Sequence, residues 1–283
     1  MIDQASRELV RRALAEDLAG YGDVTSEFTV PVELRGRGVI SAREDLVVAG
    51  LPLAQSVMEE IDQTAVFERL VDEGAQVEDG VALARIEGPA RAILTAERTM
   101  LNFLMHLCAV ATQSRRFADA VAGTGAKVVD TRKTIPGLRA WEKQAVVHGG
   151  CGNHRFGLFD MVLVKNNHLE AAGGVQAALE RVREAQSGYV KVEVEVESEA
   201  DLREALACDA DVIMLDNQDP GSLRELVSIA RGLRPDILLE ASGRVSLETV
   251  RTVAETGVDL ISTSALTMGA PPVDLGLSLE VGR

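Results

Sequence analysis

Residues 127–165 read KVVDTRKTIPGLRAWEKQAVVHGGCGNHRFGLFDMVLVK, a stretch that begins and ends with a short apolar run, KVVD and MVLVK. Each run has the length of a strand and leads into basic residues, Arg132-Lys133 after the first and Lys165 at the end of the second. Short apolar runs bounded by polar and glycine-bearing segments are typical of buried strands in a parallel sheet. The stretch therefore predicts two strands whose carboxyl ends carry positive charge.

Four further apolar runs follow downstream. They read VKVEVEVE to Glu197, VIMLD to Asp216, ILLEASG to Gly243 and VDLISTS to Ser264, with amphipathic helices in the gaps. This alternation predicts repeated βαβ units around a parallel sheet. Six strands are fewer than the eight of a closed barrel, so we expect an incomplete α/β barrel with its chemistry at the carboxyl ends of the strands.

The segment before residue 108 has a different pattern. Its periodicity predicts a helix over residues 6–18 with Ser6 as the N-cap, and a short helix near residues 53–61. Residues 28–51 and 64–88 have strand-like composition with turn signals between the runs. Strands and helices therefore mix in this part of the chain, apart from the βαβ units.

A long and largely apolar helix is expected from Pro89 to about His106. Within it Arg98, Asn102 and His106 follow one another at i, i+4 and i+8, which places them in one polar stripe. A buried arginine requires a carboxylate or phosphate partner. Arg98 could form an ion pair with Glu97 or another acid, or it could be delivered to a pocket, including that of a neighbouring subunit.

Charge is distributed unevenly. Residues 127–165 contain seven Lys and Arg against three acids, whereas the whole chain of 283 residues has 29 Lys and Arg against 44 Asp and Glu, a net charge of −15. A cationic island in an acidic protein favours a small polyanionic substrate, with scattered surface pairs as the alternative. The acidic balance argues against nucleic-acid binding, because no basic stripe is available for a phosphate backbone.

Other classes are excluded on composition and spacing. No apolar run reaches the roughly 18 residues of a membrane span, and the charged, periodic N-terminal segment is unlike a signal peptide. Cys108, Cys151 and Cys208 are too few and too widely spaced for a disulfide framework or a zinc site. We therefore expect a reduced cytoplasmic protein with no membrane partner.

Acidic residues alternate with valine in the third run. Glu193, Glu195 and Glu197 share one face of a strand, because strand side chains alternate with a period of two. That face should be turned to the barrel interior or its mouth, although a solvated edge strand is the alternative. Together with Asp216 on the next strand, the acids would form an oxygen-only site suited to Mg²⁺ shared with a diphosphate.

Basic residues from other strand ends should lie opposite the acids. Arginine forks suit carboxylates and phosphates, and lysine adds a movable point charge. Ser242-Gly243, followed by Ser246 as the expected N-cap of the next helix, would present backbone N–H groups to a terminal phosphate. The basic set comprises Arg132, Lys133, His154, Arg155 and Lys165.

Eight motifs in this order closely resemble the quinolinate phosphoribosyltransferase family, also called carboxylating nicotinate-nucleotide pyrophosphorylases. The likeness covers nearly the whole chain, and the motifs are specific as a set. They are EDLAGYGDVTS, GPARAILTAERTMLNFL, DTRKTIPGLRAWEK, GGCGNHRFGL, LVKNNH, VEVEVES, MLDN and LEASG.

The resemblance implies a type II phosphoribosyltransferase fold. An N-terminal α/β sandwich over residues 1–107, with residues 268–283 packed back on it, would precede an incomplete barrel of six to seven strands over 108–267. It further implies a homodimer with shared active sites, with a hexamer also open, in which Arg98 enters the partner's site. This would explain the polar stripe of the long helix.

The resemblance also implies roles for individual residues. Quinolinate would bind Arg132, His154, Arg155 and Lys165, with Arg98 from the partner chain. Catalysis would fall to Lys133, Glu195 and Asp216, and the sugar phosphate to Ser242, Gly243 and the segment of Ser264. The implied reaction converts quinolinate and phosphoribosyl diphosphate to nicotinate mononucleotide, diphosphate and CO₂ for NAD biosynthesis, with Mg²⁺ as cofactor.

Four positions depart from the family pattern. Cys151 replaces a glycine, and Asn166 is the second residue of KNNH where the family commonly has KDNH. Ser264 and Met268 stand where glycine and histidine are frequent. The last two positions lie at the phosphate end of the predicted barrel, where they bear on affinity for the sugar phosphate.

Three other readings stay open on sequence. One is a molybdenum-transport-associated paralogue of the same fold, and another is a Schiff-base lyase that uses Lys165 or Lys133. A non-catalytic sugar-phosphate sensor is the third, although no DNA-binding segment accompanies it. Retention of Asn153-His154-Arg155 and Lys165 favours the quinolinate enzyme over the paralogue.

Overall fold

The computed structural model describes residues 2–185, 188–208 and 210–282. It divides into two compact units. The first comprises residues 1–115, 136–150 and 270–283, and the second comprises residues 116–135 and 151–269. The predicted domain boundaries near 107/108 and 267/268 stay a prediction, and their outermost residues, Met1 and Arg283, lie outside the described residues.

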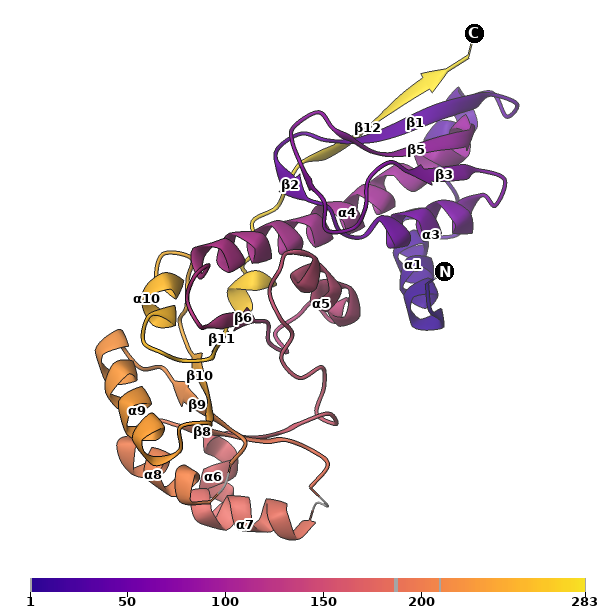
Figure 1. Ribbon diagram of the computed structural model, residues 1–283. Coiled ribbons are helices and arrows are strands. Elements are labelled where there is room, and N and C mark those ends of the chain that lie inside the picture. The colour runs from indigo at the N-terminus through magenta and orange to yellow at the C-terminus, as the bar shows by residue number, and fades with distance from the viewer. Residues whose placement is uncertain (1, 186–187, 209, 283) are drawn as a thin grey trace. The chain divides into compact units, whose positions relative to one another are not determined.

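The first unit is built on an antiparallel sheet with the strand order β12-β1-β5-β3, with a small β2-β4 pair beside it in the same unit (Figure 1). The C-terminal strand β12 pairs with β1, with Ile40 opposite Leu277. Alternate residues of β1 are buried, as expected for a sheet with one face on a core. The strands are β1 Arg35–Ala42, β2 Leu46–Val47, β3 Val66–Arg69, β4 Gln76–Val77, β5 Ala82–Pro89 and β12 Leu275–Val281.

Helices of the first unit differ from the predicted ones at their ends. The first helix begins at Gln4, and its N-cap is Asp3, whose carboxylate accepts from the Ser6 backbone N–H at 2.8 Å. Ser6 is therefore not the cap: it is buried, and its hydroxyl accepts from Trp141 Nε1 at 2.9 Å. The helices assigned to this unit are α1 Gln4–Leu18, α2 Val24–Thr29, α3 Leu51–Ile61 and α5 Arg139–His148.

The long helix α4 spans Ala90–Ala120, well past its predicted end at His106. Residues 107–120 contain no Gly or Pro, so nothing in the sequence stops the helix there. Arg98 and Asn102 are exposed on it, which corrects the expectation of a buried arginine. His106 contacts the buried carboxylate of Glu142, with 2.7 Å between Nε2 and Oε1. The stripe thus holds one residue that is hydrogen-bonded inside the unit and two exposed polar residues.

The second unit contains the parallel sheet, with the strand order β6-β11-β10-β9-β8-β7. The six predicted strands are confirmed, and β6 and β7 are the two edges of a barrel that does not close. Val129 of β6 also forms a bridge to Gly152. The strands are β6 Lys127–Val129, β7 Val162–Val164, β8 Val192–Val196, β9 Val212–Asp216, β10 Leu238–Ser242 and β11 Leu260–Ser262.

Helices of the second unit follow the strands, as βαβ units require (Figure 1). In α9, residues Leu223, Leu226, Val227 and Ala230 are buried, as their spacing predicts. Ser198 caps α8 by accepting from the Asp201 backbone N–H at 3.1 Å. The helices are α6 Asn166–Ala172, α7 Val175–Ala185, α8 Glu199–Ala207, α9 Pro220–Leu233, α10 Val250–Ala254 and the 3₁₀ turn η1 Ser264–Leu266. No helix among the described residues is long and apolar enough to cross a membrane.

Candidate active site

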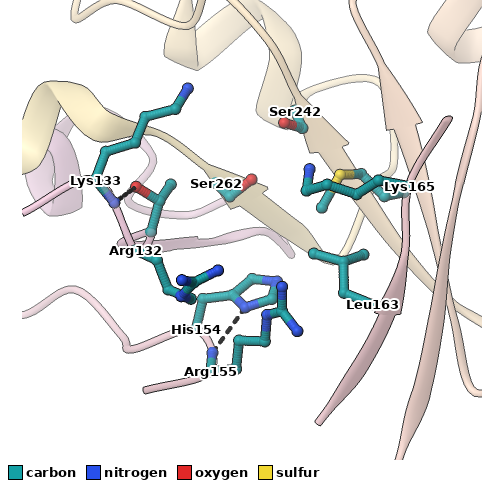
Figure 2. Close-up of a pocket in the computed structure, with 10 residues that line it drawn as sticks. Arg132, Lys133, His154, Arg155, Leu163, Lys165, Ser242 and Ser262 are labelled. Atoms are coloured by element: carbon teal, nitrogen blue, oxygen red, sulfur yellow. Dashed lines mark hydrogen bonds between the residues drawn. The ribbon is translucent and has the colours of Figure 1, made fainter. Parts of the chain in front are cut away.

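A pocket of about 300 Å³ opens at the carboxyl ends of the parallel strands in the second unit (Figure 2). Its size suits a single aromatic ring with its substituents. Most of its polar lining is basic, because the segments that follow β6 and β7 bring their cationic residues to it. The lining residues are Thr131, Arg132, Lys133, His154, Arg155, Leu163, Lys165, Met214, Ser242 and Ser262.

Two guanidinium groups occupy one side of the pocket. Arg155 is part-buried, and burial lowers its pKa, with the like charge of Arg132 lowering it further. The Arg155 Nη1 atom donates to the Met161 carbonyl at 3.1 Å, which fixes the side chain. Figure 2 shows Arg132, His154 and Arg155 gathered at one side. Two cations held so close repel each other, and a dianion between them removes that repulsion.

Lys165 joins the basic side of the pocket to the acids of β8. Its Nζ lies 2.6 Å from Glu195 Oε2, and the lysine side chain is 48% exposed whereas that of Glu195 is 8% exposed. Lys165 is also the N-cap residue of α6, where its backbone N–H donates to His168 Nδ1 at 3.0 Å. Lys165 is therefore held at the pocket wall by two contacts, one from its ammonium group and one from its backbone N–H.

Lys133 is held through its backbone. Its N–H donates to Thr131 Oγ1 at 3.0 Å, and its carbonyl accepts from Thr267 Oγ1 at 2.7 Å. The side chain of Lys133 extends freely from this anchored loop in Figure 2, on a different strand end from Lys165. Thr267 follows the 3₁₀ turn η1, so the turn that contains Ser264 sets the position of the Lys133 loop.

The outer acidic cluster consists of Glu195, Glu197 and Asp216, whose ligand atoms all lie within 4.8 Å of one another. Glu195 lies on β8, Glu197 directly follows that strand, and Asp216 ends the neighbouring strand β9. Glu197 and Asp216 retain access to solvent. A set of carboxylate oxygens open to water and to substrate oxygens is what Mg²⁺ prefers. These residues fit the ion that the family resemblance implies, and Glu197 lies beside Glu195 and Asp216, the two expected ligands.

The inner acidic cluster consists of His154, Glu193 and Glu240, whose ligand atoms also lie within 4.8 Å of one another. Both carboxylates are 0% exposed. His154 Nε2 lies 3.0 Å from Glu193 Oε2 and 3.4 Å from Glu240 Oε2. A nitrogen ligand, full burial and the neighbouring guanidinium of Arg155 make this cluster a poor site for Mg²⁺.

Proton positions in the inner acidic cluster follow from two opposing observations. Burial works to lower the pKa of His154, but hydrogen bonds and charges of Glu193 and Glu240 outweigh it and raise the pKa to about 9. Yet His154 Nδ1 accepts from the Arg155 backbone N–H at 2.7 Å, which requires that Nδ1 carry no proton. A ring with its proton on Nε2 and none on Nδ1 is the form that this hydrogen bond fits. Burial raises the pKa of Glu193, with Glu240 adding to the shift.

The ends of β9 and β10 meet tightly beside the pocket. Gly243 has φ +132°, and a Cβ there would lie 2.9 Å from Asn217 Oδ1 and 3.2 Å from its Cα. The Asn217 N–H donates to the Ser242 carbonyl at 3.0 Å, which brings the two segments together. Only glycine satisfies both requirements. A second hollow of about 570 Å³ lies on the far side of Ser242 and is lined by Arg244, which the sequence analysis did not single out.

Ser246 is not the N-cap of the following helix, which corrects that expectation. Helix α10 begins at Val250 with Thr249 as its N-cap, and Ser246 starts the turn that precedes it. Thr263 instead ties this region together, because its Oγ1 donates to the Val245 carbonyl at 3.0 Å. Ser264 lies in the turn η1 directly after Thr263. Backbone donors here come from loops rather than from a long helix.

Arg98 lies in the first unit, in a hollow of about 220 Å³ lined also by Glu16, Asp17 and Asn102. Among residues 2–185, 188–208 and 210–282, no hydrogen bond or ion pair of Arg98 is found, so the alternative of a pair with Glu97 receives no support. Its guanidinium is exposed at the surface of a single chain.

The structure brings most of the predicted site residues together. Arg132, Lys133, His154, Arg155, Lys165 and Ser242 line one pocket, and Glu195 touches Lys165. Gly243 and Asp216 adjoin it at the strand ends, while Ser264 lies in the next turn and Arg98 is in the other unit. Sequence reasoning gave Glu240 no role and overlooked Thr131, Leu163, Met214, Ser262 and Thr267. An acid inside the apolar run ILLEASG was the available signal for Glu240.

An antiparallel-sheet unit together with an incomplete six-stranded α/β barrel, with a basic pocket at its strand ends, is the type II phosphoribosyltransferase fold. Sequence models of two family domains match the chain. "Quinolinate phosphoribosyl transferase, N-terminal domain" covers residues 23–108, and "Quinolinate phosphoribosyl transferase, C-terminal domain" covers residues 110–278. The chain belongs to the quinolinate phosphoribosyltransferase family, which confirms the resemblance seen in its motifs.

Individual relatives agree over nearly the full length. The nicotinate-nucleotide pyrophosphorylase [carboxylating] of Mycobacterium leprae is 43% identical over 278 residues, covering 97% of each chain. A mitochondrial quinolinate phosphoribosyltransferase [decarboxylating] of Nicotiana tabacum is 40% identical, covering 97% of this chain and 84% of its own. The solved nicotinate-nucleotide pyrophosphorylase of Francisella tularensis superposes with a TM-score of 0.93 at 36% identity, covering 99% of this chain and 98% of its own.

Proposed function

We infer that this chain is a pentosyltransferase that joins quinolinate to phosphoribosyl diphosphate and releases nicotinate mononucleotide, diphosphate and CO₂ in NAD biosynthesis. The observation that carries this function is the pairing of a basic pocket with an acidic cluster at the same strand ends. A pyridine with two adjacent carboxylates matches the basic pocket, and a sugar with diphosphate and phosphate groups matches the remaining donors.

Quinolinate would be held by its carboxylates. Arg132 and Arg155 present two forks from one side, and Lys165 adds a point charge from the other. The pocket adds Leu163 and Met214 as apolar surface for the ring. Charged groups in this arrangement orient the ring nitrogen toward the sugar, so that a reaction between two molecules proceeds as if within one.

The sugar diphosphate would lie toward the acids and Lys133. Lys133 balances charge that builds on the departing diphosphate, and Glu195 stabilises the oxocarbenium-like sugar as the ring nitrogen attacks. Glu195, Glu197 and Asp216 would hold Mg²⁺, which supplies charge neutralisation for the diphosphate when bound. Ser242 and Gly243 offer hydroxyl and backbone donors to the 5-phosphate.

Loss of CO₂ needs no nucleophile from the protein. Once the ring nitrogen carries the sugar, its positive charge stabilises the electron pair left on the adjacent ring carbon as CO₂ departs, and that carbon then takes up a proton from water to give nicotinate mononucleotide. Position therefore matters more than a reactive side chain at this step. A Schiff-base lysine needs an activated amine, whereas Lys165 Nζ is 2.6 Å from Glu195 rather than in an apolar pocket.

The active unit would be a homodimer in which Arg98 enters the partner's pocket. Support comes from the exposed guanidinium of Arg98, which has no ion-pair partner among the described residues of its own chain. An arginine at that place completes a set of donors for two carboxylates. Higher assembly and the predicted cytoplasmic location stay predictions.

The direct test supplies quinolinate and phosphoribosyl diphosphate, with and without Mg²⁺, and follows CO₂ and nicotinate mononucleotide. We expect equal amounts of both products, and none without the metal. Products absent under all metal conditions would overturn the assignment. Borohydride trapping with a keto substrate tests the lyase alternative, and we expect no adduct at Lys165.

A further inference from the structure

The inner acidic cluster is placed where simple electrostatics would not put it. Glu193 and Glu240 lie behind a pocket that we propose binds a dianion, and both carboxylates are 0% exposed. None of their four oxygen atoms has a well-formed hydrogen bond among the described residues. Buried and incompletely paired carboxylates are expensive and repel an anionic substrate. Their presence therefore calls for a role other than attraction.

Strand geometry explains how the two acids meet. They come from β8 and β10, which are separated in the sheet by β9. Inward residues of alternate strands share a layer inside an α/β barrel. The Nε2 atom of His154 lies between them, at 3.0 Å from Glu193 and 3.4 Å from Glu240.

Both ring nitrogens of His154 are used within the chain. The Nδ1 atom accepts from the Arg155 backbone N–H at 2.7 Å, as Figure 2 shows, and Nε2 faces the two acids. A neutral imidazole has one donor and one acceptor. Here Nδ1 accepts a hydrogen bond, and Nε2 contacts the two carboxylates without a well-formed hydrogen bond to either.

The His154 ring acts on the next residue, Arg155. The backbone N–H of His154 donates at 2.9 Å to Asp130, a fully buried residue directly after β6. Its ring accepts the next N–H, which fixes the backbone of Arg155 where the chain turns toward the pocket. The guanidinium of Arg155 is then tied to the Met161 carbonyl. Together these three hydrogen bonds restrict the orientation of the Arg155 guanidinium.

We propose that Glu193 and Glu240 are positioning residues for quinolinate: they orient the His154 ring, which holds the Arg155 backbone so that its guanidinium faces the pocket. The inference rests on the proposed function and adds two residues that do not touch the substrate. It also gives His154 a second role, through the Arg155 backbone, beside the contact with quinolinate that the family resemblance implies.

The test compares quinolinate affinity by calorimetry with the KM values of both substrates. We expect Glu240→Ala to weaken quinolinate binding roughly tenfold while the KM of phosphoribosyl diphosphate changes by less than about twofold. Glu240→Gln keeps the size and one acceptor, so it should fall between Glu240→Ala and wild type. If the alanine variant does not fold, the glutamine variant serves as the measurement, with a loss of about threefold expected.

A double-mutant cycle tests the route through the ring. In a His154→Ala background, Glu240→Ala should weaken quinolinate binding by less than about twofold further, because the link is already broken. A tenfold effect that persists without the ring would overturn the proposal. So would unchanged affinity in Glu240→Ala while His154→Ala is weakened, since that pattern indicates direct contact by His154.

A matched control separates positioning from general destabilisation. Asp259 pairs with Arg231 at 2.6 Å and accepts the Leu239 N–H at 2.7 Å, beside Glu240 but away from the pocket. Asp259→Asn should lower the melting temperature without changing quinolinate affinity. Equal loss of affinity for both substrates in Glu240→Gln would overturn the proposal. Wild-type protein that binds no quinolinate would instead overturn the proposed function, and this inference with it.

Discussion

Glu193 and Glu195 lie two positions apart on the same face of β8, and yet their surroundings are opposite. Glu193 meets a histidine and a second buried acid, whereas Glu195 meets an exposed lysine and belongs to a cluster open to solvent. A shift of two residues along β8, toward its carboxyl end, moves a carboxylate from the barrel interior to its mouth. Under the proposed roles, acids of one repeating pattern serve two functions, positioning inside the barrel and ion binding at its mouth.

The largest effect should come from the outer acidic cluster. Asp216→Asn removes a carboxylate charge where diphosphate and Mg²⁺ would meet, so kcat should fall roughly 100-fold or more. Quinolinate affinity should stay within about threefold, because Asp216 does not line the quinolinate pocket. Steady-state kinetics over a range of Mg²⁺ concentrations checks this, with a higher Mg²⁺ requirement expected.

Asp219→Asn is the matched control for that experiment. Asp219 lies at the same rim but caps α9, where its carboxylate accepts from the Gly221 N–H at 2.8 Å. Asparagine caps a helix about as well as aspartate, so this change should leave both stability and kcat nearly unchanged. If Asp219→Asn reduced turnover as much as Asp216→Asn, the outer acidic cluster would have no special role.

The next largest effect concerns Arg155, on which the inner acidic cluster is proposed to act. Arg155→Ala should weaken quinolinate binding roughly 50-fold, because a charged hydrogen-bonding partner of a buried carboxylate is lost. Arg155→Lys should recover only part of it, since lysine lacks the planar fork. Calorimetry with quinolinate alone measures both. Unchanged affinity in Arg155→Ala would place quinolinate elsewhere.

A third experiment asks whether the active site of one chain needs Arg98 from a second chain. Arg98→Ala and Lys165→Ala should each be nearly inactive. An equal mixture of exchanging dimers should recover roughly a quarter of wild-type activity, since half the dimers are mixed and each has one complete site. The absence of rescue, with subunit exchange shown independently, would mean that Arg98 does not act across chains.

The smallest effect should come from the turn that follows β11. Ser264→Gly removes a side chain from a turn whose position is set by Thr263 and Thr267, so the KM of phosphoribosyl diphosphate should change by less than about threefold. Met268→Ala should do even less, because Met268 is 62% exposed. A larger change in either variant would show that this turn contributes side-chain contacts to the sugar phosphate.

Much of the barrel could be predicted because its signals are local. Each apolar run of the second unit became a strand of the parallel sheet, and the alternation of glutamate with valine placed Glu193 and Glu195 on one face. The caps of α1 and α10 could not be placed, because capping depends on which side chain reaches a free N–H. The end of α4 was predicted too early, although no Gly or Pro interrupts residues 107–120. Ser6 has a suitable residue type for a cap, but Asp3 occupies that position.

The site divides in the same way. Basic residues at strand ends identified Arg132, Lys133, Arg155 and Lys165, because parallel strands bring their carboxyl ends to one edge. Glu240 could not be found by this reasoning, since its significance arises only when β8 and β10 place it against His154. No spacing in the sequence relates residue 240 to residue 154.

By itself, the sequence determined the class of fold, the family and the set of charged residues available for chemistry, because periodicity and charge are properties of consecutive residues. Only the tertiary structure decided how those charges are used. The assembled sheet placed one glutamate of β8 against His154 and Glu240 and the next beside Lys165 and Asp216, so burial and partners differ between them. Long-range contacts set the surroundings of an ionisable group, and those surroundings determine whether it positions, binds or reacts.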